Sequence, residues 1–161
     1  MNWYVLYTLS HRTNRILYNL NNNQELHAFI PKYEVCQRKT KEITIKPMFN
    51  NYIFVKTQLN QTDFNDLLLN MKEQNDGLIK QLKNKETSAL TADEIMFFTS
   101  VLDNNHIMRL SHGYQANGIT HVTSGPLKLY EKHIVKVDKH NQCVYLDLFF
   151  FERRIIMGID L

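Results

Sequence analysis

The chain has 161 residues, the size of one ordinary domain, although two small modules would also fit this length. Hydrophobic residues make up 43% and charged residues 22%, a composition that supports a packed core and argues against global disorder. The net charge of +3 permits contact with nucleic acid without requiring it, because electrostatic binding depends on local clusters.

The cysteines and the apolar segments exclude several classes of protein. Cys36 and Cys143 have no second cysteine near either of them, which excludes the paired spacing of a structural zinc site and argues against a disulfide scaffold. The apolar start, residues 1–9, lacks a basic region and is too short to span a membrane. We therefore expect a cytoplasmic, monomeric protein with no membrane segment, no metal and no cofactor.

The first thirty residues predict a strand, a helix and a second strand. Residues 3–9 are nearly all aromatic or β-favouring, which is typical of a strand buried on much of both faces. Ser10 offers an N-cap for a helix over residues 11–22, whose apolar side chains share one arc. The second strand, over residues 26–30, ends at Pro31.

The following residues alternate strands and helices. Further strands are predicted over residues 42–46, 51–57 and 78–82, and a further helix over residues 62–73. Thr91 and Glu94 fit a capping box at the start of a third helix that ends near Leu102. The order β-α-β-β-β-α-β-α predicts an α+β fold in which helices flank a mainly antiparallel sheet.

The last third of the chain has a different character. Residues 111–118 contain two glycines and few apolar anchors, which indicates a linker. No helical period follows, and short strands are predicted over residues 119–123, 133–137, 144–151 and 155–159. We therefore expect an N-terminal domain over residues 1–110, a linker over 111–118 and a small β-barrel over 119–161.

Three segments carry a resemblance to a known family. Residues 3–7 (Trp-Tyr-Val-Leu-Tyr) and 47–55 (Pro-Met-Phe-Asn-Asn-Tyr-Ile-Phe-Val) are similar to two signatures of the NusG N-terminal domain. The stretch from Gly125 to Asp138 is similar to the KOW motif, an SH3-like β-barrel, of the same family. Its details resemble the specialised antiterminator paralogues such as LoaP or RfaH.

The resemblance implies a transcription elongation or antitermination factor that is not an enzyme. Such a factor docks on the clamp helices of RNA polymerase and suppresses pausing or termination at selected operons, where a DNA or nascent RNA element recruits it. Its KOW domain binds a second partner, for example a ribosomal protein. The chain has Asn50-Asn51 where Pro-Gly is usual, and Glu152 where a glycine is usual; asparagine tolerates a left-handed backbone, so a similar turn is expected at the first position.

The expected polymerase-binding surface is aromatic. Large aromatic side chains give much contact area at little entropic cost, and the resemblance implies contacts through Tyr7, Phe49, Tyr52, Phe54, Ile95 and Phe98. Phe49 lies in a loop that begins at Pro47, and Tyr52 lies in the strand that follows; a loop of this kind favours outward side chains. The competing interpretation places these residues in the core, above all Phe54 and the two residues at helical spacing.

Two basic clusters are candidates for nucleic-acid binding. His11, Arg12 and Arg15 lie at the start of the first predicted helix, where backbone N–H groups also attract phosphate. Arg38, Lys39 and Lys41 lie around a predicted hairpin. Each cluster also has an alternative interpretation. The first could be an ordinary solvated helix face, and the charges of the second could serve to prevent strand aggregation.

In the KOW segment, Phe151 and Arg153 match a family pattern used for partner binding, and solubilising charge on a small barrel is the alternative. Catalytic signatures such as His-Glu-x-x-His, Gly-x-Ser-x-Gly and the P-loop are absent from the sequence. Two other functions stay open: a ribosome- or RNA-binding KOW protein that does not bind polymerase, and an interaction scaffold.

Overall fold

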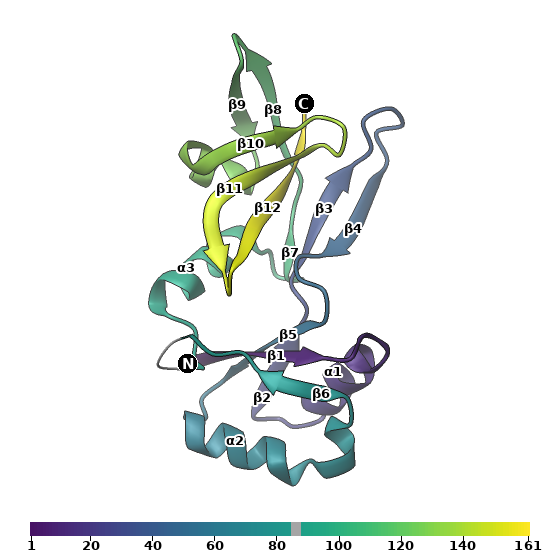
Figure 1. Cartoon of the computed structure of the whole chain (residues 1–161), viewed down its shortest axis with the longest axis vertical. Helices are drawn as coiled ribbons and strands as arrows, with labels where there is room; N and C mark the ends of the chain where they lie inside the picture. Colours follow the sequence, from purple (N-terminus) through teal and green to yellow (C-terminus); the bar gives the residue numbers. More distant parts are fainter. Residues whose placement is uncertain (85–87) are drawn as a thin grey trace. The chain divides into compact units, whose positions relative to one another are not determined.

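The computed structural model describes residues 1–84 and 88–161, and it confirms the predicted α+β fold class (Figure 1). The chain forms two compact units that are interleaved along the sequence. We call residues 1–30 and 49–95 the N-terminal unit, and residues 31–48 and 96–161 the C-terminal unit. The domain boundaries expected from the sequence stay a prediction.

The N-terminal unit is built on a four-stranded sheet of order β2-β5-β1-β6. Its strands are β1 (Asn2–Thr8), β2 (Leu26–Phe29), β5 (Tyr52–Thr57) and β6 (Leu78–Gln81). β1 pairs antiparallel with both β5 and β6, and β2 pairs antiparallel with β5. The predicted antiparallel sheet is therefore present, with strand ends within two residues of those expected.

The helices begin at different kinds of cap. Ser10 does not cap the first helix as predicted: residues Ser10–Arg12 form a 3₁₀ turn (η1), and α1 spans Thr13–Asn21. The buried Thr13 hydroxyl contacts the Thr8 hydroxyl at 2.6 Å, which fixes this later start. The other helices are α2 (Gln61–Asn70), the 3₁₀ turn η2 (Lys72–Asn75) and α3 (Ala92–Val101). The capping box before α3 is confirmed by bonds of 2.9 and 3.2 Å between Thr91 and Glu94.

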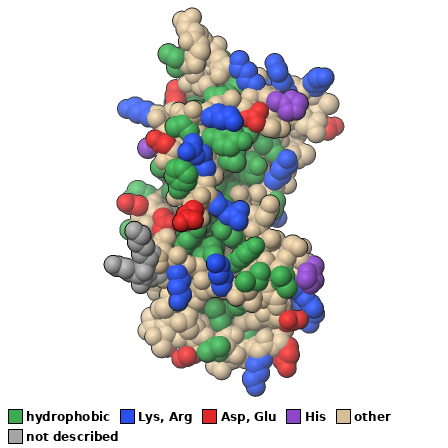
Figure 2. Space-filling view, viewed as in Figure 1, with side chains coloured by type: hydrophobic (Ala, Val, Ile, Leu, Met, Phe, Trp, Pro, Cys, Tyr) green, Lys and Arg blue, Asp and Glu red, His purple; other side chains and the backbone are tan. Residues whose placement is uncertain are grey.

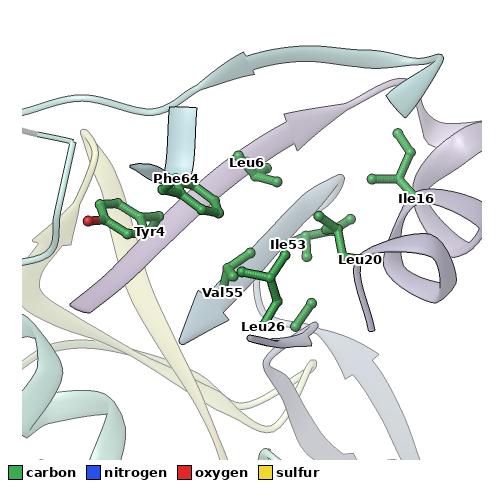
Figure 3. Packing of buried hydrophobic residues seen from close by; sticks show 9 residues of the cluster. Tyr4, Leu6, Ile16, Leu20, Leu26, Ile53, Val55 and Phe64 are labelled. Carbon is green, nitrogen blue, oxygen red and sulfur yellow. The ribbon is translucent and has the colours of Figure 1, made fainter. Parts of the chain in front are cut away.

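The core of this unit lies between the sheet and the helices α1 and α2 (Figure 3). Alternate residues of the strands point to this side, and the ring of Tyr4 stacks on Phe64 of α2 with centroids 4.4 Å apart. Ile16 and Leu20 supply the contribution of α1. One face of the sheet is thereby covered by helices of its own unit.

We expect Phe64→Ala to lower the free energy of unfolding by about 3–5 kcal/mol, because the change leaves a cavity beneath the sheet. Urea denaturation followed by circular dichroism measures the loss. Leu69→Ala on the exposed side of the same helix serves as the matched control and should change stability by less than about 0.5 kcal/mol. Equal losses in the two variants would contradict the assigned packing.

The C-terminal unit contains a hairpin and a larger sheet. Strands β3 (Lys32–Cys36) and β4 (Ile43–Pro47) form the hairpin. The short strand β7 (Ile107–Met108) pairs with β3 in the parallel direction. The sequence analysis missed β3, although its residues Lys32 to Val35 alternate between charged and apolar side chains. Asp103 and Glu34 both bind Arg109, and Glu34 also accepts a bond of 2.9 Å from the Leu110 N–H.

The larger sheet has five strands in the order β10-β11-β12-β8-β9. They are β8 (Ser111–Ala116), β9 (Ile119–Ser124), β10 (Ile134–Asp138), β11 (Cys143–Phe150) and β12 (Arg153–Asp160). Residues 111–116, expected in a linker, therefore form a strand that pairs with β9 and β12. Residues 126–133 form a 3₁₀ segment (η3) that the sequence analysis did not foresee.

The hairpin packs against this sheet at a glycine. A Cβ atom on Gly158 of β12 would lie 2.0 Å from the carbonyl oxygen of Glu34 in β3, so only glycine fits at this position. Lys41, near the hairpin tip, is 2.7 Å from Asp160 at the end of β12. These contacts fix the orientation of the hairpin within its unit.

The turn between β11 and β12 places two residues in the left-handed region. Phe151 has φ of 48° and Glu152 has φ of 66°, and Phe150 pairs with Arg153, which together define a two-residue turn. Such turns prefer Asn-Gly, and Asn117-Gly118 between β8 and β9 has that sequence.

We expect Glu152→Gly to raise the free energy of unfolding by about 1 kcal/mol, since glycine removes the steric cost of positive φ. Thermal unfolding followed by circular dichroism measures the change. The reverse substitution in the equivalent turn, Gly118→Glu, should lower stability by a similar amount. A destabilised Glu152→Gly variant would contradict the turn geometry.

Candidate functional surfaces

A row of aromatic rings crosses the face of the N-terminal sheet opposite to α1 and α2. Trp3 and Tyr7 come from β1, on the side of that strand opposite to Tyr4 and Leu6. Neighbouring ring centroids lie 5.6–6.2 Å apart along the series Trp3, Phe29, Phe54, Phe49, Tyr52 and Tyr7. The structure thus brings together four of the predicted polymerase-binding residues and adds Trp3 and Phe29.

The two added residues have a signal in the sequence. Trp3 is two and four positions from Val5 and Tyr7, so it shares their face of β1 by the period of two. Phe29 pairs directly with Phe54 across β2 and β5. The two-residue period of a strand is enough to place Trp3 on the same face as Tyr7. Placing Phe29 requires the register between β2 and β5, which the sequence alone does not determine.

Phe49 and Tyr52 do not face outward as predicted. Their exposed fractions are only 4% and 5%, and Phe54 is fully buried. The reason is the turn that precedes β5: Asn51 has φ of 68°, and its carbonyl oxygen accepts a bond of 3.0 Å from the Thr8 N–H. This turn folds the loop back, so the ring of Phe49 stacks on Tyr52 and on Phe54. The expected left-handed turn at the Asn pair is confirmed.

One cation lies on the aromatic face. The Lys56 ammonium is 4.5 Å from the centroid of the Trp3 ring and 5.0 Å from that of Phe29. Burial lowers the pKa of Lys56, because water solvates the charged form less well there. The rings offset part of this cost through their negative faces. The face is therefore apolar with one positive charge at the Trp3 end.

Ile95 and Phe98 do not join this row. The structure assigns Phe98 to the C-terminal unit, where its ring lies 5.0 Å from the ring of Phe150 and is 1% exposed. Ile95 is half-buried in the first part of α3 and belongs to the N-terminal unit. Phe97 packs on Tyr130 in the same way as Phe98 on Phe150. The second half of α3 is therefore a packing element of the C-terminal unit.

The first basic cluster borders a hollow of about 440 Å³ on the N-terminal unit. Arg12 and Arg15 line it together with Lys72, which the sequence analysis did not include, with the acidic residues Glu73 and Asp76, and with Asn75, Gly77 and Leu78. Arg12 makes an ion pair of 3.2 Å with Asp76, whereas Arg15 and Lys72 are exposed. His11 lies in η1 and is also exposed. The hollow thus presents cations from two segments about sixty residues apart.

Gly77 holds the Arg12 stem in place. It has φ of 100°, and a Cβ atom there would lie 2.4 Å from the Arg12 Cβ. Its carbonyl oxygen also accepts a bond of 2.8 Å from the Leu9 N–H. Only glycine permits both the backbone conformation and the close approach.

The second basic cluster lies at the tip of the β3–β4 hairpin. Arg38, Lys39 and Lys41 are all exposed, and the Asp160 carboxylate 2.7 Å away raises the pKa of Lys41 through a hydrogen bond. Figure 2 shows Lys and Arg side chains gathered with a histidine where this tip and the turn between β10 and β11 lie. Both elements belong to the C-terminal unit.

The predicted partner-binding pair lies at the β11–β12 turn. Phe151 is half-buried against Phe150, with ring centroids 4.6 Å apart, and Arg153 is exposed at the start of β12. Beside them, the Arg154 guanidinium lies 4.8 Å from the centroid of the exposed Phe149 ring. The turn therefore offers aromatic and cationic groups together.

Within residues 1–84 and 88–161 no three His, Cys, Asp or Glu side chains gather as metal ligands. No helix in this described part of the chain is long and apolar enough to cross a membrane.

Comparison with known families gives one match. The family described as "Transcription termination factor nusG" matches residues 1–99, more than half of the chain. The chain therefore belongs to the NusG family, and it is a transcription factor that acts on elongation or termination. No curated protein sequence matches it.

Proposed function

We propose that the protein docks on the clamp helices of RNA polymerase and suppresses pausing or termination at selected operons, as the LoaP- and RfaH-like members of its family do. The observation that supports docking most is the aromatic row opposite to the helices of the N-terminal unit. α1 and α2 already cover one face of the sheet, and the rings on the other face form an apolar surface that would suit a pair of partner helices once it is uncovered.

Docking on this face has a structural requirement. Phe49, Tyr52 and Phe54 are buried, so the groups that cover them must move before a partner contacts their rings. The free energy of that movement reduces the apparent affinity by the fraction of molecules in the open state.

Suppression of pausing follows from a difference in affinity. A factor that binds one conformation of the polymerase clamp better than another shifts the enzyme toward that conformation, and only this difference has an effect. The aromatic face supplies the binding energy, and the factor needs no chemistry of its own.

Recruitment to particular operons would use the hollow lined by Arg12, Arg15 and Lys72. Two exposed cations beside an arginine held by Gly77 suit the phosphates of non-template DNA or of nascent RNA. His11 and the hairpin cations Arg38, Lys39 and Lys41 are further candidates for the same contact. Phe151 and Arg153 would bind a second partner, such as a ribosomal protein.

The test is a binding measurement with purified components. The protein is immobilised and exposed in turn to core RNA polymerase and to ribosomal subunits from the same organism. Binding of core polymerase supports the proposal. Binding of ribosomal subunits alone would overturn it in favour of a ribosome-associated KOW protein.

A further inference from the structure

Strand β4 is an open edge of its sheet. The order β4-β3-β7 leaves it paired on one side, and all five of its residues are exposed. Two hydrogen bonds show which residues of β4 bond to β3. The Gln37 N–H donates to the Glu42 carbonyl at 2.8 Å, and the Met48 N–H donates to the Pro31 carbonyl at 2.9 Å. In an antiparallel pair such bonded positions alternate with unbonded ones.

This alternation of bonded and unbonded residues determines which backbone groups of β4 point away from β3. Residues 42, 44, 46 and 48 direct their N–H and C=O groups toward β3. Ile43 and Ile45 therefore direct theirs toward the free edge, and Pro47 offers only a carbonyl there. The edge presents two donors and three acceptors in the spacing of one more strand.

The side chains of the same two residues are unusually apolar for such a position. Ile43 and Ile45 are 54% and 48% exposed and lie on one face of β4. An exposed edge strand with β-branched residues is a template for pairing with another extended chain. A matching strand would bury both isoleucines while it satisfies the free backbone groups.

The charges around the edge select the kind of strand. Arg38, Lys39 and Lys46 are exposed near it, Lys41 is paired with Asp160, and Glu42 is the acidic residue within this stretch. The surplus of positive charge around the edge favours an acidic strand over a basic one. A second copy of β4, which would place Glu42 opposite Lys46, is the competing occupant, and a dependence of the Ile43 and Ile45 amide shifts on protein concentration without peptide would reveal it. A nucleic acid would use the cations but neither the backbone groups nor the isoleucines.

We propose that the β4 edge binds an extended, acidic segment of a partner protein by strand addition. Backbone bonds to Ile43 and Ile45 supply affinity, and apolar residues at every second position of the partner pack on the two isoleucines. Acidic residues at the intervening positions face Lys46 and the hairpin tip. Pro47 ends the pairing, which fixes the register.

The experiment uses the full chain labelled with ¹⁵N and the peptide acetyl-Glu-Val-Glu-Val-Glu-Val-Glu-amide as a probe. The amides of Ile43 and Ile45 should shift and exchange with solvent at least about tenfold more slowly when the peptide binds, because they gain hydrogen bonds. The amides of Thr44 and Lys46 are already bonded to β3 and should change much less. A peptide with lysine in place of glutamate should not bind.

A proline variant isolates the backbone contact. Ile45→Pro removes an outward donor without removing a bond to β3, so the hairpin should persist while the probe binds at least about tenfold more weakly. Ile45→Val is the matched control and should bind the probe as the native chain does. Equal binding by the proline and valine variants would overturn the proposal, as would equal binding of the lysine peptide.

A twelve-residue single-stranded RNA and its DNA equivalent complete the test. If either perturbs the Ile43 and Ile45 amides and competes with the acidic peptide, the edge serves nucleic acid and the proposal is overturned. The proposal does not depend on polymerase binding, since every measurement uses the isolated chain.

Discussion

Replacing Phe49 and Tyr52 together by alanine is expected to weaken binding to core RNA polymerase by at least about 100-fold. Two aromatic side chains at the centre of an interface each contribute about 2 kcal/mol or more, and 1.4 kcal/mol corresponds to a factor of ten. Both rings lie at the middle of the aromatic row, between Phe54 and Tyr7. Biolayer interferometry with immobilised polymerase measures the affinity.

These rings are buried, so loss of binding has to be separated from loss of structure. Phe64 of α2 packs against the opposite face of the same sheet, and Phe64→Leu serves as a control for destabilisation. The double variant must retain a cooperative thermal transition, and Phe49→Leu with Tyr52→Leu provides a gentler version. If a folded double variant binds polymerase as the native chain does, the aromatic face is not the docking surface.

Arg15→Gln combined with Lys72→Gln is expected to reduce nucleic-acid affinity by about tenfold near physiological salt. It should also lower the slope of log affinity against log salt by about 1.4 to 1.8, because each phosphate contact contributes about 0.7 for single strands and 0.9 for duplex DNA. Both residues are exposed at the rim of the hollow, so the fold should not change. Fluorescence anisotropy with leader RNA and with non-template DNA measures the effect.

A control variant removes two positive charges at residues that do not line the hollow. Lys128→Gln combined with Lys132→Gln alters two exposed lysines of η3 in the C-terminal unit. If this pair reduces affinity and salt slope as much as the Arg15 and Lys72 pair, binding follows total charge. The hollow would then have no special role in recruitment.

Much of the fold follows from local patterns in the sequence. The run of aromatic and β-favouring residues predicts β1, clean alternation predicts β4, and the Thr91–Glu94 capping box predicts the start of α3. The prediction that Ser10 caps the first helix was wrong, because several residues near a helix start can serve as its cap. The hydroxyl contact between Thr8 and Thr13 places the start of α1 at Thr13 instead. That contact depends on tertiary packing, which local propensity does not describe.

The candidate surfaces were less predictable than the fold. A proline-bounded loop indicated outward rings, yet the left-handed Asn51 turns Phe49 back onto the sheet. Lys72 lies far from Arg12 in sequence, and tertiary contacts such as the Arg12–Asp76 ion pair and the close approach of Gly77 to the Arg12 stem bring their segments together. Phe98 has the spacing of a residue on a helix face, but its contact with Phe150 needs the C-terminal unit.

Transcription in vitro through an intrinsic terminator, with the organism's own polymerase and a leader sequence that the protein binds, tests the central claim most directly. The account predicts that the native chain raises the fraction of readthrough several-fold, whereas the variant altered at Phe49 and Tyr52 does not. Equal readthrough with and without the native chain, under conditions where it binds polymerase, would contradict the claim.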